Sequence, residues 1–238
     1  MQAEALLKQR LTADPTNTRY LLLSAQVQRA LGQKTIASKN YEAILERDPR
    51  SVPALIGLAQ LAIDAQEYEQ ADELLGRLLR LKPAHIPALL ERIRLVASRD
   101  GAEAGLEQLN KLWQRYPNSI AVTTEVVNAA VAGNEYQKAI DEARRFYRRQ
   151  PDDTGAAYLY IRTLQRAGLL SEAIQAVRKL IDREPDHLSH RAYLGELYLQ
   201  KKDIEQAQRL VDELLTAEPG YLPALFIQAR LLIVQQQY

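Results

Sequence analysis

Proline returns every 34 residues along this chain of 238 residues, with no insertion or deletion. A series of seven small residues keeps the same step. The prolines are Pro15, Pro49, Pro83, Pro117, Pro151, Pro185 and Pro219, and the small residues are Ala3, Ala37, Ala71, Gly105, Ala139, Ala173 and Ala207. A fixed period of this length is typical of solenoids, in which one structural unit is stacked many times.

The proline series divides the chain into six complete repeats between two half repeats. With proline at position 32 of each unit, the complete repeats are 18–51, 52–85, 86–119, 120–153, 154–187 and 188–221, and the half repeats are 1–17 and 222–238. Each unit of a solenoid contacts mainly its neighbours. We therefore predict one continuous domain over residues 1–238.

Each repeat carries two runs of apolar residues spaced three and four apart, which is the spacing of one helix face. A short polar turn such as Gly133-Asn134-Glu135 separates the runs. The periodic proline ends the second run, because proline disfavours helical geometry in the residue before it. Candidate N-caps such as Asn17 or Thr18 and Asp153 or Thr154 follow it. The sequence therefore predicts an all-α fold of antiparallel helix pairs.

The repeat resembles the tetratricopeptide repeat (TPR) family, whose unit has Leu-Gly and Tyr on the first helix and Ala and Pro on the second. Residues 188–221 match best, with Leu194-Gly195, Tyr198, Ala207 and Pro219. The resemblance implies a right-handed superhelical solenoid that binds ligands along a concave groove of first helices. The pentatricopeptide RNA binders are excluded, because their units are one residue longer and would fall out of step.

The position that is usually small on the first helix departs from the family pattern in the three central repeats. It holds Ile93, Val127 and Ile161 there, but Ala25, Ala59, Gly195 and Ala229 elsewhere. Larger residues at this position should push the two helices of a repeat apart. We expect irregular curvature in the middle of the solenoid.

Composition and motifs argue against several classes of function. Lys and Arg number 31 against 30 Asp and Glu, so no net charge attracts nucleic acid, and there is no cysteine. The apolar stretch 222–234 is too short to span a bilayer, and the first residues are not a signal peptide. No phosphate loop, zinc-protease motif or nucleophile elbow occurs. We predict a soluble, non-catalytic chain without a cofactor or membrane insertion.

Two clusters have both a functional and a structural interpretation. Asp186, His187 and His190 could form a weak metal site, but we interpret them as ordinary solvated loop residues and predict no metal. The arginine-rich segment 143–149 could bind phosphate. Because Phe146 and Tyr147 fall on core positions and acidic residues lie nearby, we interpret its arginines as outward-facing helix residues instead.

The groove implied by the resemblance has a mixed character. Its best polar candidates for partner binding are Arg94, Asn128, Tyr158, Arg162, Arg166 and Tyr193. Arg162 has the geometry to fork onto a carboxylate, and Tyr158, one turn earlier, to cover the apolar part of a peptide. The alternative is that all six are ordinary exposed residues.

The Hsp70/Hsp90-type carboxylate clamp of the family, which holds Glu-Glu-Val-Asp tails, is not matched. It needs lysine, asparagine and arginine at set positions of three successive first helices. Only Asn128 falls on this pattern, followed by Leu159, Ser189 and Tyr193.

The leading hypothesis is a scaffold that binds a protein or peptide partner in the groove. The alternatives are a structural spacer or oligomerisation module, and a segment that handles polysaccharide or nucleic acid. Long bacterial envelope proteins similar to this one carry such arrays, so the resemblance favours a periplasmic setting over a cytoplasmic one.

The two half repeats complement each other, since residues 1–17 supply a second helix and residues 222–238 a first helix. The last helix is apolar around much of its circumference and includes Phe226 and Leu232. We expect the chain to be a segment of a longer array, and predict head-to-tail self-association through these two residues.

Overall fold

In a computed structural model of the chain, residues 2–236 are described, and within this range all regular secondary structure is helical. Met1 and residues 237–238, the outermost positions of the predicted solenoid, lie outside this described range. The helices form two compact units, residues 1–117 and residues 118–238. The continuity of the two units as one solenoid stays a prediction.

Unit 1 contains a leading helix and three helix pairs. The helices are α1 (Gln2–Ala13), α2 (Thr18–Ala30), α3 (Lys34–Arg47), α4 (Val52–Asp64), α5 (Tyr68–Leu81), α6 (Ile86–Asp100) and α7 (Ala102–Arg115). The pairs α2–α3, α4–α5 and α6–α7 coincide with the repeats predicted from the proline series.

Unit 2 contains three helix pairs followed by a single first helix. The helices are α8 (Ile120–Ala132), α9 (Tyr136–Arg149), α10 (Thr154–Arg166), α11 (Leu170–Arg183), α12 (Leu188–Gln200), α13 (Ile204–Ala217) and α14 (Leu222–Gln236). The predicted solenoid of 34-residue helix pairs is therefore confirmed as the local architecture of both units.

The helix boundaries lie where the sequence places their signals. Asn17 caps α2 by accepting hydrogen bonds from the backbone N–H groups of Arg19 and Tyr20, at 3.1 and 3.2 Å. Asp153 caps α10 by accepting from the Ala156 N–H at 2.7 Å. Such caps satisfy backbone donors that have no partner inside the helix.

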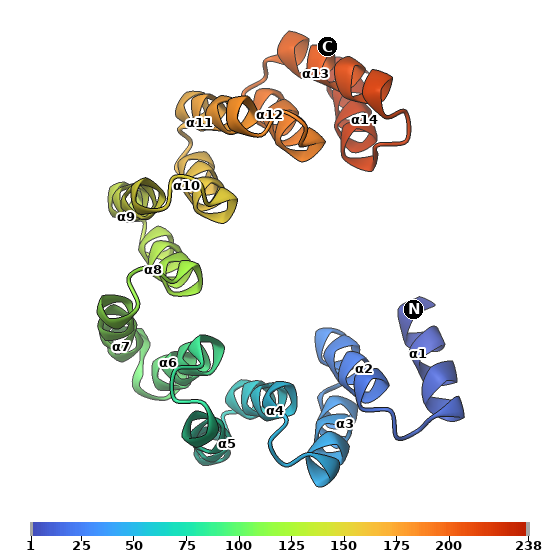
Figure 1. Cartoon of the computed structure of the whole chain (residues 1–238), viewed down its shortest axis with the longest axis vertical. Coiled ribbons are helices and arrows are strands. Elements are labelled where there is room, and N and C mark those ends of the chain that lie inside the picture. The colour runs from blue at the N-terminus through green and yellow to red at the C-terminus, as the bar shows by residue number, and fades with distance from the viewer. Residues whose placement is uncertain (1, 237–238) are drawn as a thin grey trace. The chain divides into compact units, whose positions relative to one another are not determined.

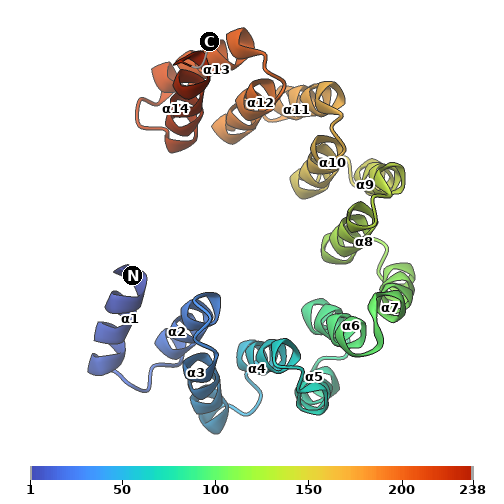
Figure 2. The same ribbon diagram turned by 180° about the vertical axis from the view of Figure 1, so that it is seen from behind.

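In each unit the first helices of the repeats lie on one side and the second helices on the other. Figure 1 shows α2, α4 and α6 on one side of unit 1, and Figure 2 shows α8, α10, α12 and α14 on one side of unit 2. The pairs α2 and α4, α4 and α6, α8 and α10, and α12 and α14 contact each other directly. First helices therefore supply neighbouring surfaces along each unit.

The two helices of the α6–α7 pair approach closely one turn away from Ile93, and the widening expected at Ile93 itself stays a prediction. In α7 the small position holds Gly105 rather than alanine, and a Cβ atom added there would lie 2.6 Å from the Ala97 Cβ of α6. Val127 and Ile161 are both fully buried in unit 2, and irregular curvature stays a prediction.

Gly105→Ala should therefore lower the free energy of unfolding by about 1–3 kcal/mol, although alanine stands at this position in the other repeats. Gly76→Ala in α5 is the matched control, since an added Cβ there meets only the end of the Arg80 side chain, at 3.5 Å. The control should stabilise the chain by about 0.5–1 kcal/mol. Urea unfolding would measure both, and a stabilising Gly105→Ala would contradict the close packing.

Candidate functional site

A groove of about 300 Å³ lies between the first helices α8 and α10 of unit 2. It brings together four of the six residues predicted for partner binding: Asn128, Tyr158, Arg162 and Arg166. The rest of the lining is Ile120, Thr124, Val127, Gly155, Leu159 and Thr163.

The helical repeat explains why three of these side chains share the groove. Tyr158, Arg162 and Arg166 are spaced four apart on α10, so that they project from one face. Asn128 comes from α8, which packs beside α10. Tyr158 is half-buried, whereas the two arginines are exposed.

The groove contains two guanidinium groups, and neither aspartate nor glutamate lines it. Arg166 donates a hydrogen bond from Nη1 to the Asn128 Oδ1 at 2.8 Å, so this pair is already formed. Arg162 makes no hydrogen bond or ion pair with any residue between 2 and 236 that the structure describes. The groove thus offers one unpaired cation beside the apolar side chains of Ile120, Val127 and Leu159.

Tyr193 lies next to the groove rather than in its lining. Its ring meets the Tyr158 ring edge to face, with 5.5 Å between the ring centres, and its hydroxyl donates to the Gln165 side chain. Burial raises the pKa of both tyrosines, so they remain protonated at neutral pH. The predicted cluster therefore extends from α10 to α12 through the edge-to-face contact of Tyr158 and Tyr193.

The interpretation of His190 as a solvated loop residue was wrong. It lies in the first turn of α12 and is only 3% exposed. Its Nδ1 lies 2.7 Å from the Tyr158 hydroxyl and its Nε2 lies 2.9 Å from the Glu184 Oε2. The only sequence signal was the replacement of a small residue, such as Ala54 or Ala156, at this repeat position.

Glu184 anchors this network. Its Oε1 accepts a hydrogen bond from the Thr154 hydroxyl at 2.7 Å and another from the Arg183 Nε at 3.0 Å. Hydrogen bonding to His190 first, then to Thr154 and Arg183, lowers the pKa of Glu184 from 4.5 to about 2. The carboxylate therefore stays ionised through the physiological range.

Glu184 should stabilise the fold above pH 4.5, and this contribution should disappear as the pH falls from 4.5 toward about 2. Glu184→Gln should lower the melting temperature at pH 7 and flatten its decline in this acidic range. Glu213→Gln, at an exposed position of α13, is the control and should change neither. Thermal melts from pH 2 to pH 7 would test this, and parallel declines in wild type and Glu184→Gln would contradict it.

Arg94, the fifth predicted residue, lies in unit 1 and is paired there. Its guanidinium forms ion pairs with Asp64 of α4 and with Glu91, the latter at 3.2 Å. The charge of Arg94 is therefore neutralised by acidic groups of its own unit. This distinguishes it from Arg162.

The arginine-rich segment of α9 has the predicted structural arrangement. Phe146 is fully buried, and Arg144 and Arg145 pair with Asp141 and Glu142. The Tyr147 ring stacks on Tyr160, with 6.0 Å between the ring centres. These contacts support the interpretation as a packed helix with outward-facing cations.

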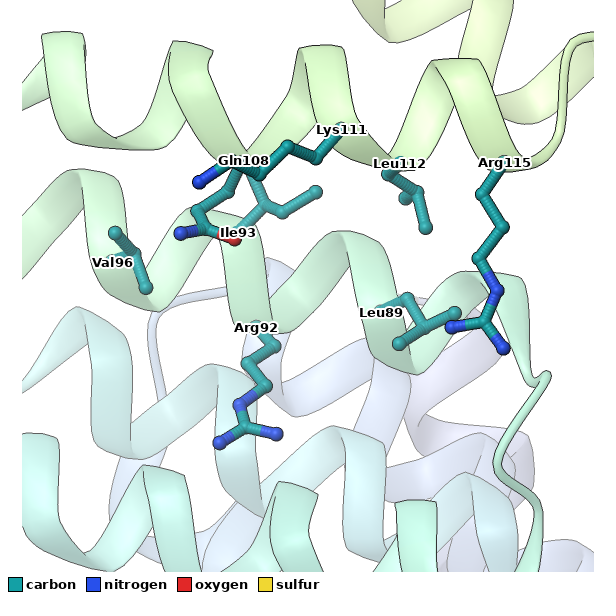
Figure 3. Close-up of a pocket in the computed structure, with 8 residues that line it drawn as sticks. All are labelled: Leu89, Arg92, Ile93, Val96, Gln108, Lys111, Leu112 and Arg115. Atoms are coloured by element: carbon teal, nitrogen blue, oxygen red, sulfur yellow. The ribbon is translucent and has the colours of Figure 1, made fainter.

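A second hollow, of about 390 Å³, lies between α6 and α7 in unit 1 (Figure 3). Leu89, Ile93 and Leu112 lie between the two helices, while Arg92 extends away from α7. Arg92 pairs with Asp72 at 3.6 Å, and Lys111, another lining residue, pairs with Glu107 at 2.6 Å. The cations of Arg92 and Lys111 are thus already paired with acidic side chains. It contains none of the predicted site residues.

The predicted end contact residues are exposed on α14. Phe226 and Leu232 have exposed fractions of 66% and 53%. The helix is less apolar on its outer surface than predicted, because Ile227 and Leu231 are buried. The remaining exposed apolar residues are Leu222, Leu225 and Ile233.

Within residues 2–236, no three histidine, aspartate or glutamate side chains are grouped so that they could hold a metal ion. The helices described in this range are also too short or too polar to cross a membrane.

Two family models, both described as tetratricopeptide repeat, match the chain, one over residues 36–93 and 166–231 and the other over residues 127–187. The chain belongs to the tetratricopeptide repeat family. The prolines and small residues that set its period are thus those of TPR units. No curated protein sequence matches the chain.

Solved TPR structures agree with this assignment at the level of the fold. A tetratricopeptide repeat protein from Parabacteroides merdae is 17% identical, with a TM-score of 0.54 over 97% of this chain and 91% of that one. Yeast Tom70 is 16% identical, with a TM-score of 0.53 over 99% of this chain and 59% of that one. Identities this low establish the TPR fold alone.

Proposed function

We propose that this TPR chain is a non-catalytic scaffold that binds a peptide or protein partner in the groove between α8 and α10, and that the bound segment carries a carboxylate. The observation that carries the proposal is the unpaired guanidinium of Arg162 in a groove that no acidic residue lines. A planar guanidinium binds a carboxylate through two parallel hydrogen bonds.

The groove also suits the rest of a peptide. Tyr158 offers ring surface one turn from Arg162, and Val127 and Leu159 supply apolar contacts. Thr124 and the Asn128–Arg166 pair add polar groups able to bind a peptide backbone. Tyrosine and arginine are residue types that often dominate binding energy at interfaces. Arg94 is not part of this proposal, because acidic groups of unit 1 already pair with it.

Alanine substitution tests the assignment of these contacts. With a peptide selected on the intact chain from a random library, Tyr158→Ala and Arg162→Ala should each weaken binding by about 1 kcal/mol or more without loss of helicity. Arg148→Ala, an exposed arginine of α9, is the control and should have little effect. The reverse ranking, together with a steep loss of affinity in salt, would favour nucleic acid as the ligand instead.

We also propose that α14 mediates end-to-end contact between copies of the chain. Leu232 and Ile233 are exposed, whereas the equivalent Ala62 and Ile63 of α4 are buried in unit 1, where α4 packs on its second helix α5. The exposed face of α14 is therefore the face that packs against the second helix of a complete repeat. By sequence register α1 is such a helix, so we assign α1 of a second copy as the occupant.

The bacterial envelope setting and the periplasmic compartment stay predictions from the family resemblance. A structural spacer or oligomerisation module and a segment that handles polysaccharide or nucleic acid stay the alternatives.

A further inference from the structure

The hydroxyl of Tyr158 is held by an imidazole that is itself buried. The equivalent positions of α4, α6, α10 and α14 hold alanines that are fully buried, namely Ala54, Ala88, Ala156 and Ala224. In α12 this position holds His190. A buried imidazole is costly unless both nitrogens have partners, and here Tyr158 and Glu184 supply them at 2.7 and 2.9 Å.

The chemistry of Glu184 fixes the tautomer of His190. An ionised carboxylate only accepts hydrogen bonds, and Thr154 and Arg183 already donate to its other oxygen. The Nε2 of His190 must therefore carry the proton that it shares with Glu184. In the neutral imidazole the Nδ1 is then bare, and it accepts the Tyr158 O–H.

The direction of the hydrogen bond between Tyr158 and His190 consequently depends on the charge of His190. While the imidazole is neutral, the Tyr158 proton points toward α12, and the oxygen offers only lone pairs to any other group. When the imidazole is protonated, its Nδ1–H donates to the Tyr158 oxygen. The Tyr158 O–H is then released to donate to a bound group or to the neighbouring Ser189 side chain.

We propose that His190 is a positioning residue that sets the polarity of Tyr158, so that the groove gains a hydrogen-bond donor for carboxylates when His190 is protonated. The inference rests on the proposed function of the groove, and it makes preference for a carboxylate over an amide depend on pH. The ligand itself does not need to touch His190.

Several titratable and charged groups lie around the imidazole. The His187 ring lies 5.2 Å from the His190 ring, and Arg183 donates to the same Glu184 carboxylate that is hydrogen-bonded to the His190 Nε2. The tyrosines of this region are Tyr158 on α10, Tyr193 on α12 and Tyr221 before α14.

Matched peptides test the inference on the intact chain. The probes are N-acetyl-Leu-Leu-Leu with a free carboxylate and the same peptide with a C-terminal amide, titrated at pH 8 and pH 5.5. In wild type the ratio of amide Kd to carboxylate Kd should rise about tenfold at the lower pH, since a hydrogen bond to a charged group is worth this much. His190→Gln and Tyr158→Phe should each abolish the rise.

His187→Gln is the control, since this neighbouring side chain is 65% exposed, and it should leave most of the rise in place. A ratio that does not change with pH in wild type, or that still rises in Tyr158→Phe, would overturn the inference. Carboxylate binding that still depends on Arg162 would in that case leave the proposed function of the groove intact.

If neither peptide binds at either pH, the groove proposal fails, and nitrogen NMR of the His190 ring still decides the hydrogen-bond direction. At pH 8 the ring should be the Nε2–H tautomer in the unliganded chain. An Nδ1–H tautomer would overturn the inference without reference to any ligand.

Discussion

Replacing Leu78 by alanine is expected to lower the free energy of unfolding by about 2–5 kcal/mol. Leu78 is fully buried in the core of unit 1, on α5, at a repeat position that also holds the buried Ile44 of α3 and Leu180 of α11. Its removal leaves a cavity that helices fixed by their neighbours fill only in part. The measurement is urea unfolding of the intact chain.

Leu81→Ala is the matched control, because Leu81 lies on the same helix but is 42% exposed. The control should change the free energy of unfolding by less than about 1 kcal/mol. Since each repeat is stabilised mainly by its neighbours, hydrogen exchange should show the loss of protection from Leu78→Ala concentrated in α4, α5 and α6. An equal loss of protection in α12 and α13 would contradict this local coupling.

Replacing both Phe226 and Leu232 by glutamate is expected to abolish concentration-dependent self-association. Two carboxylates on the exposed face of α14 would have to lose their hydration on contact with leucine side chains of α1, such as the exposed Leu6, and unpaired charges are rarely buried. Sedimentation velocity over a wide range of concentration would measure the effect. Leu106→Glu, which changes an exposed leucine of α7, is the control and should leave association intact.

A wild-type chain that stays monomeric at high concentration would rule out the contact through α14. Association that survives in Phe226→Glu with Leu232→Glu would place the contact elsewhere. Neither result would affect the groove between α8 and α10, which lies on other helices of unit 2.

The fold could be predicted almost completely from the sequence, because its signals are local and repeated. Each periodic proline ends a second helix whatever the rest of the chain does, and seven copies fix the register of every helix pair. What the sequence could not show is how closely two helices approach. Gly105 reads as one more small residue, and only the structure shows that an added Cβ atom would lie 2.6 Å from the Ala97 Cβ.

The candidate site was predictable in its members but not in their pairings. The repeat register placed Tyr158, Arg162 and Arg166 on one face. The pairing of Arg94 with Asp64 of α4, and of Arg166 with Asn128 of α8, depends on how neighbouring helices lie. His190 was misread because its partners Tyr158 and Glu184 lie 32 and 6 residues away, on other elements.

Peptide selection on the wild-type chain and on Arg162→Ala, run in parallel from one random library, tests the central claim most directly. If Arg162 anchors a carboxylate, the wild-type chain should enrich peptides in which an acidic group lies beside apolar residues, and the variant should lose that enrichment. Recovery of the same acidic peptides by both proteins, with equal affinity, would contradict the assignment of Arg162 and of the groove between α8 and α10.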